Sequence, residues 1–141
     1  MHDTGDGQTR PVIVFRRLGT SMAFNDSLWD RYRIGEESKT NDSATSAPAR
    51  RNPFWKAPPG ASAQEAATKI EALNPRGLIS LVCNVSVNSW SNKLARRTQR
   101  EVEELYKELK ANLVPGAILV PSGIYALIRA QNAGCAYMPG T

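Results

Sequence analysis

The sequence is poor in the residues that carry much of enzyme chemistry. Its 141 residues include one histidine, His2, and two cysteines. Because His2 lies in a polar leader, a Ser–His–Asp or Cys–His catalytic set is excluded. Two cysteines and one histidine supply neither a closed zinc site nor a disulfide-rich scaffold. A Walker-type phosphate loop and a dinucleotide-binding glycine pattern are also missing. We therefore expect no metal and no cofactor.

Long apolar runs are missing as well. The longest, Leu78–Cys83 and Ala117–Val120, fall far short of the roughly 20 residues that cross a bilayer. The first ten residues contain no basic stretch followed by an apolar one, so they do not form a secretory signal. These features predict no membrane partner and a cytoplasmic location for the chain as given.

The charge is moderately basic, with a formal net charge of +5. Aromatic residues do not alternate with the cations as a single-strand stacking platform requires, so we predict no nucleic-acid partner. The densest charged stretch is Lys93–Glu108, which is basic first and acidic afterwards. On one helix this order opposes the helix dipole. It is interpreted as a solvated surface, with a salt-bridged partner surface as the alternative.

The length fits a single domain. Residues 1–10 form a polar leader that we expect to be disordered, and residues 11–141 form the domain. An irregular insertion at about residues 36–62 is rich in Pro, Ser, Thr and Asn, and it contains Phe54 and Trp55. The insertion is interpreted either as a flexible excursion or as a loop pinned by these two rings, which could act as a lid.

The remaining segments alternate between two hydrophobic patterns. Continuous apolar runs predict strands at Pro11–Arg16, Leu78–Cys83, Ala117–Val120 and Cys135–Met138. Apolar residues spaced by three or four predict helices at Ser21–Arg33, Ala63–Leu73, Ser91–Leu113 and Gly123–Asn132. This order predicts an α/β fold with a mostly parallel sheet.

Cys83 is the nucleophile that this arrangement favours. It ends a predicted strand and precedes Asn84 in a predicted turn, and ligands of open α/β sheets bind at the carboxyl ends of strands. Ser122 and Gly123 follow the next strand and open a helix. The free N–H groups there would hold an anion or lower the pKa of a nearby thiol. The alternative is that Cys83 is inert packing. Cys135 is interpreted as packing, and a Cys83–Cys135 disulfide depends on a distance that the sequence does not give.

A family resemblance follows from three stretches taken in order. These are Gly77–Cys83, then Val114–Gly123 with its Val-Pro-Ser-Gly strand end, then Arg129–Tyr137 with Gln-x-x-Gly before an aromatic strand. Together they resemble the DsrE/DsrF-like (YchN-like) family, over about residues 62–140. The segment Leu28–Trp55 is similar to a subgroup with a long insertion, whose members are often exported.

The resemblance implies a three-layer α/β/α domain with a parallel sheet of four to five strands, assembled as a trimer or hexamer. In sulfur-relay members, the cysteine at the position of Cys83 accepts sulfur as a persulfide and passes it to a partner protein. The family also has a strand and a helix before the segment matched to Pro11–Arg16. Either this chain is shortened, in which case an export signal and a periplasmic location are open, or its sheet has four strands and an exposed edge.

Two functional hypotheses follow. In the first, Cys83 is the sulfur carrier of a persulfide-transfer protein, a sulfurtransferase-type activity, assisted by backbone donors near Ser122 and Gly123. In the second, the chain is a non-catalytic oligomeric or small-ligand-binding module. There Cys83 is structural, Phe54 and Trp55 anchor a cover, and the ligand lies near Asn84 and Ser122. A covering insertion would favour a small ligand over transfer between proteins.

Overall fold

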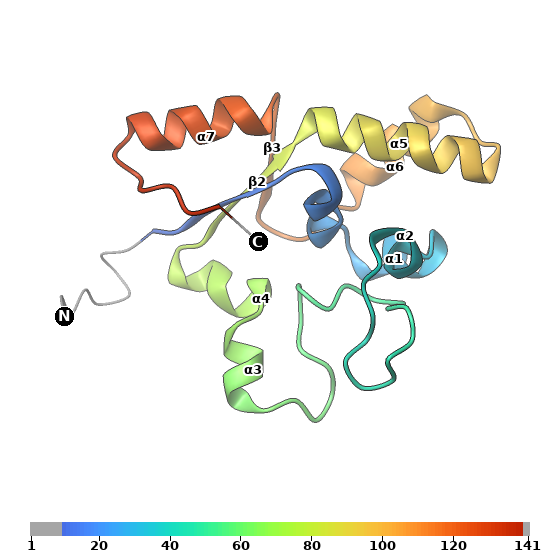
Figure 1. Cartoon of the computed structure of the whole chain (residues 1–141), viewed down its shortest axis with the longest axis horizontal. Coiled ribbons are helices and arrows are strands. Elements are labelled where there is room, and N and C mark those ends of the chain that lie inside the picture. The colour runs from blue at the N-terminus through green and yellow to red at the C-terminus, as the bar shows by residue number, and fades with distance from the viewer. Residues whose placement is uncertain (1–9, 140–141) are drawn as a thin grey trace.

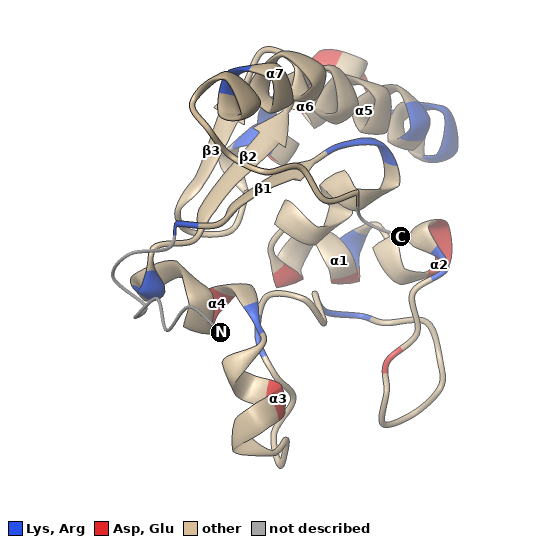
Figure 2. Ribbon diagram, turned by 60° about the vertical axis from the view of Figure 1, so that its left-hand side comes forward, with Lys and Arg blue, Asp and Glu red and all other residues tan. Residues whose placement is uncertain are grey.

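The computed structural model describes residues 10–139, so the predicted leader lies almost wholly outside the described residues. The three described strands form one parallel sheet in the order β1-β2-β3; Figure 1 labels β2 and β3, and Figure 2 labels all three. They are β1 (Val12–Phe15), β2 (Ile79–Cys83) and β3 (Ala117–Val120). The predicted α/β class and the parallel sheet are confirmed. The register sets Phe15 opposite Val82 and Cys83 opposite Val120, which aligns the carboxyl ends of the strands.

The predicted strand at Cys135–Met138 is wrong. Gly134 has a positive φ of 92° and the chain beyond it is exposed, without a strand partner among residues 10–139. An apolar run forms a strand when burial and strand pairing compensate for the entropy lost on ordering its backbone. Within residues 10–139, this segment has neither. Residues 10–139 therefore contain three strands, where the apolar runs of the sequence predicted four.

The two faces of the sheet are covered differently. Ile13, Phe15, Val82 and Leu119 belong to or pack against the main hydrophobic core. On the opposite face, Val14 lies beneath the start of α7 (Gly123–Asn132), in register with Leu81 and Ile118. Helix α7 contacts β1 and β2, and the Ile118 side chain on β3 remains half-exposed.

The predicted helix Ser21–Arg33 is divided into shorter pieces. A 3₁₀ helix, η1 (Arg17–Ala23), precedes α1 (Asp26–Arg31), and α2 (Ile34–Ser38) follows after Arg33 in a left-handed conformation. Asn25 starts α1 by accepting a hydrogen bond from the Leu28 N–H, a cap that competes with a continuous helix. Gly35, two residues past the end of the predicted helix, is inside α2 and lies against Ala49.

The insertion at residues 36–62 is irregular beyond the end of α2, as predicted. Phe54 and Trp55 are half-buried against the hydrophobic core, and the Phe54 ring lies 6.3 Å from that of Trp29. Asn52 fixes the loop because its buried amide donates to the Met22 and Phe24 carbonyls and accepts from the Phe54 and Trp55 N–H groups. The segment is a pinned loop.

The predicted helix Ala63–Leu73 is interrupted in its middle. It consists of α3 (Ala63–Ala67) and α4 (Ile70–Leu73), followed by the 3₁₀ turn η2 (Asn74–Arg76). The N–H groups of Ile70 and Glu71 donate to the Phe54 and Trp55 carbonyls instead of continuing the helix. Tertiary hydrogen bonds to the pinned loop therefore override the local helical pattern.

Most of the predicted helix Ser91–Leu113 is helical, but its start and its continuity were predicted wrongly, and the predicted turn before it is part of a helix. The chain passes from β2 directly into α5 (Asn84–Thr98), turns at Gln99 with φ 58°, and continues as α6 (Val102–Ala111). Basic residues thus gather where α5 ends (Figure 2), and acidic residues occupy the first turn of α6. Both placements are favourable for a helix dipole.

The predicted strand Ala117–Val120 and the predicted helix Gly123–Asn132 are confirmed. β3 leads to α7, whose N-cap position is Ser122, although the Ser122 side chain makes no capping hydrogen bond. Within residues 10–139, none of the helices has the length and apolar character needed to cross a membrane.

Candidate functional site

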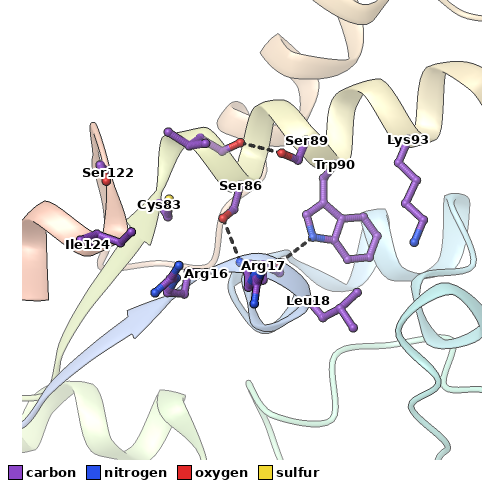
Figure 3. Close-up of a pocket in the computed structure, with 11 residues that line it drawn as sticks. Arg16, Arg17, Leu18, Cys83, Ser86, Ser89, Trp90, Lys93, Ser122 and Ile124 are labelled. Carbon is purple, nitrogen blue, oxygen red and sulfur yellow. Dashed lines mark hydrogen bonds between the residues drawn. The ribbon is translucent and has the colours of Figure 1, made fainter. Parts of the chain in front are cut away.

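A cavity of about 440 Å³ lies where the three strands end. Arg16 and Arg17 follow β1, Cys83 ends β2, and Ser122 follows β3. Side chains of α5 and α7 complete the wall (Figure 3), and the full lining is Arg16, Arg17, Leu18, Cys83, Val85, Ser86, Ser89, Trp90, Lys93, Ser122 and Ile124. This is the place at which open α/β sheets bind ligands.

Cys83 stands at the N-cap position of α5 with 5% of its surface exposed. Burial raises the pKa of its thiol. Hydrogen bonding from the Ser86 hydroxyl and from the N–H groups of Gly123, Ser86 and Val85 lowers that pKa by more, so the result lies below the ordinary value of a cysteine. The thiolate is the nucleophilic form of cysteine, and this environment favours it.

Ser86 is held in the orientation that serves Cys83. Its Oγ accepts a hydrogen bond from the Arg17 N–H at 2.8 Å, which leaves the hydroxyl proton for the sulfur. Arg17 adopts a left-handed conformation with φ 54°, and its carbonyl accepts from Trp90 Nε1 at 3.1 Å. Such a conformation costs a non-glycine residue about 1 kcal/mol or more. The α5 side chains therefore fix the turn that follows β1.

Gly123 brings the start of α7 against the cysteine. A Cβ at this position would lie 3.2 Å from the Cys83 Cβ, 3.3 Å from Val14 Cγ1 and 3.4 Å from the Arg16 Cβ. Only glycine fits there without movement of its neighbours, and its N–H contributes to lowering the pKa of Cys83. The backbone donor predicted near Ser122 and Gly123 thus reaches the sulfur.

The structure brings together only some of the residues singled out in the sequence. Cys83 and Ser122 line the cavity, with Gly123 directly behind the cysteine. Asn84 belongs to the first turn of α5, and its side-chain oxygen accepts a hydrogen bond from the Tyr106 hydroxyl at 2.8 Å. Phe54 and Trp55 pack on the hydrophobic core and do not line this cavity. The insertion is therefore no lid over Cys83.

Several lining residues had no place in the sequence prediction. Ser86, Trp90 and Lys93 lie on α5, and Arg16 and Arg17 directly follow β1. The signal for Ser86 was its spacing, since a Cys-x-x-Ser stretch at the start of a helix places the serine beside the cysteine. Placing the helix start at Ser91 concealed this spacing. Ser86, Trp90 and Lys93 then follow one another at helical intervals.

The second cysteine does not join the site. Both thiols are free, and Cys135 is exposed beyond the far end of α7, whereas Cys83 touches its start. A ten-residue helix separates its ends by about 15 Å, more than a disulfide spans. In the part of the chain that the structure describes, no three His, Cys, Asp or Glu side chains form a group that could hold a metal ion.

The cavity is equipped for nucleophilic chemistry on a small ligand. It joins a buried thiol that favours the thiolate, a hydroxyl donor, and three cationic side chains, namely Arg16, Arg17 and Lys93. Comparisons with protein-family models, with curated proteins and with solved structures give no match to this chain.

Proposed function

We propose that this protein accepts a sulfane sulfur atom on Cys83 and carries it as a persulfide to an acceptor. The observation that supports this most directly is the lowered pKa of a thiol that lines a cavity large enough for a small molecule. Sulfur transfer requires a thiolate with access to a donor, and it requires neither a histidine base nor a metal.

The transfer balances without an external oxidant. The Cys83 thiolate attacks the outer sulfur of a donor persulfide, a new S–S bond forms on Cys83, and the S–S bond of the donor breaks. The donor leaves as a thiolate that takes a proton from water. Its inner sulfur is reduced while the Cys83 sulfur is oxidised. An acceptor thiolate later repeats the same step on the Cys83 persulfide, which restores the cysteine.

The resemblance to the DsrE/DsrF-like family is part of this proposal. Two of the stretches that suggested this family lie side by side. The strand that ends at Cys83 meets the Val-Pro-Ser-Gly stretch at Gly123. A three-layer domain with four to five strands would need at least one strand more than the three that residues 10–139 contain. The family assignment and a cytoplasmic location, with export as its alternative, stay predictions.

A homo-oligomer and a sulfur-donating or sulfur-accepting protein also stay predictions. Large apolar side chains are at least half-exposed on β3 and along α7, namely Ile118, Ile124, Tyr125 and Ile128. Such a patch is typical of surfaces at which proteins meet. We expect sedimentation velocity to show a trimer or hexamer, and a monomer at micromolar concentration would contradict this part.

Intact-protein mass spectrometry after incubation with polysulfide tests the function. We expect the wild type and Cys135→Ser to gain a sulfur atom that a reductant removes, and Cys83→Ser to gain none while keeping its far-ultraviolet circular dichroism. Cys135 is the matched control because it is the other thiol of the chain. Equal loading of the folded Cys83→Ser variant would refute the proposal.

The second candidate is a ligand-binding module in which Cys83 is structural, favoured by the 5% exposure of that residue. It predicts that native Cys83 reacts with iodoacetamide far more slowly than Cys135. Fast, stoichiometric alkylation of Cys83 at neutral pH would exclude it. Slow alkylation together with no persulfide on the folded protein would favour it over sulfur transfer.

A further inference from the structure

Positively charged side chains line the cavity that contains Cys83. Arg16, Arg17 and Lys93 line the cavity, and among the described residues no aspartate or glutamate does so. Lys93 forms an ion pair with Glu37 and lies 5.5 Å from the centre of the Trp90 ring. The two arginine side chains have no acidic partner within residues 10–139, so their charges are open to a ligand.

The rest of the cavity suits an organic molecule. Leu18, Trp90 and Ile124 supply apolar wall, and Figure 3 shows Ile124 on one side of the two arginines and Leu18 and Trp90 on the other. A volume of about 440 Å³ falls within the range of small-molecule sites. Guanidinium groups bind carboxylates with paired hydrogen bonds, and apolar walls accept the carbon skeleton. The lining thus combines an anion site, an apolar surface and a nucleophile.

We propose that the sulfur donor of Cys83 is a low-molecular-weight organic persulfide that carries a carboxylate. Arg16 and Arg17 bind the carboxylate, the side chain of Trp90 packs on the carbon skeleton, and the outer sulfur of the donor reaches Cys83. The Cys83 thiolate bonds to that sulfur, and the donor leaves as a thiolate that still carries its carboxylate. This inference rests on the proposed function and names the substrate class for the same site.

The charge preference of the cavity is measured first, in an alkylation assay that involves no sulfur transfer. Iodoacetate is anionic and iodoacetamide is neutral, and both alkylate a thiolate. We expect the ratio of the iodoacetate rate constant to the iodoacetamide rate constant at Cys83 to fall about threefold in Arg16→Gln or Arg17→Gln and about tenfold in the double variant. A threefold change corresponds to about 0.65 kcal/mol, which is the interaction of two unit charges roughly 6 Å apart in water. Arg129→Gln is the matched control, because Arg129 is an exposed arginine near the far end of α7. A ratio that stays unchanged in the double variant would overturn the proposal.

The donor itself is tested with glutathione persulfide and with the persulfide of glutathione diethyl ester, which lacks the carboxylate charges. We expect the acid to load Cys83 about tenfold faster than the ester, and Arg16→Gln/Arg17→Gln to remove this advantage. Equal loading by both, or loading by a protein persulfide alone, would overturn the donor class and leave the proposed function standing. Loading by none of these donors nor by polysulfide would refute the function itself.

Discussion

At the scale of single residues, the chemistry of Cys83 depends on one hydroxyl group. Within residues 10–139, Ser86 supplies the side-chain hydrogen bond that lowers the Cys83 pKa, and backbone N–H groups supply the other hydrogen bonds that lower it. The Ser86 hydroxyl is itself held by the N–H of Arg17. A donor that is fixed before the reaction favours the thiolate more than a freely rotating one does.

Ser86→Ala should therefore raise the pKa of Cys83 and slow its alkylation by iodoacetamide at neutral pH about tenfold. The measurement is the pH dependence of the alkylation rate, followed at Cys83 by mass spectrometry. Ser89→Ala is the matched control, because Ser89 lines the same cavity but donates its hydrogen bond to the Val85 carbonyl. A pH profile that both variants share with the wild type would contradict this role for Ser86.

Residue-level prediction from sequence was limited by where helices begin. Cys83 and Gly123 were identified because strand ends and helix starts are readable from apolar runs and cap residues. Ser86 was missed because the helix was expected to start at Ser91 and not at Asn84. Arg16 and Arg17 gave no signal, since a basic pair after a strand is common on any protein surface.

At the scale of elements, the α5–α6 break shows what periodicity alone does not contain. Apolar residues at three- and four-residue steps continue across Gln99, so the pattern predicts one helix. The charge order argued otherwise, because bases before acids oppose the dipole of one helix and suit the junction of two. The structure resolves that conflict with a left-handed Gln99 between α5 and α6.

Gln99→Gly should stabilise this turn. Glycine adopts φ 58° without the steric cost that glutamine bears, so the free energy of unfolding should rise by about 0.5–1 kcal/mol, after the larger backbone entropy of glycine is subtracted. Urea unfolding at pH 7 measures the change. Ala95→Gly, within α5, should instead lower the free energy by about 1 kcal/mol. Destabilisation of equal size in both variants would show that the turn does not favour glycine.

Gly35→Ala should destabilise the junction of α2 with the pinned loop. A Cβ there would overlap the backbone N and O of Ala49 and lie 2.9 Å from the Thr40 carbonyl oxygen, so the loop must move. We expect the free energy of unfolding to fall by about 2 kcal/mol or more. Gly19→Ala serves as control, because a Cβ at Gly19 meets nothing within 4 Å. Equal stability of the two variants would contradict this account.

At the scale of the whole molecule, the sequence predicted the fold class and the end of the sheet that carries the site. The β1, β2 and β3 runs are apolar and β-branched, and the connections between them are long enough for parallel crossovers. The pinned loop and the interruption before Ile70 were not predictable in the same way. They depend on hydrogen bonds between segments distant in sequence, such as Asn52 with Phe24.

Glu108 supplies the clearest link between such distant segments. Its carboxylate accepts hydrogen bonds from the Tyr32 hydroxyl at 2.6 Å, from Arg100 at 2.9 Å and from Arg31. It thereby ties the end of α1 to the α5–α6 turn and to α6. Burial raises the pKa of Glu108, but these three donors lower it by more, so its folded pKa lies below the ordinary glutamate value.

The sign of the resulting pH dependence follows directly. The pKa of Glu108 in the folded protein is lower than that of a glutamate in the unfolded chain, about 4.3, so its ionised carboxylate stabilises the fold at pH values above about 4.3. This contribution disappears as the pH falls through the folded pKa. Glu108→Gln should lower the free energy of unfolding by about 2 kcal/mol at pH 7 and by much less at pH 2. Glu104→Gln, which removes an exposed pair with Arg100, should change it by less than about 0.5 kcal/mol at either pH. Urea unfolding of both variants measures the difference, and a loss for Glu108→Gln that is equal at pH 7 and pH 2 would show that its ionised carboxylate does not hold these elements together.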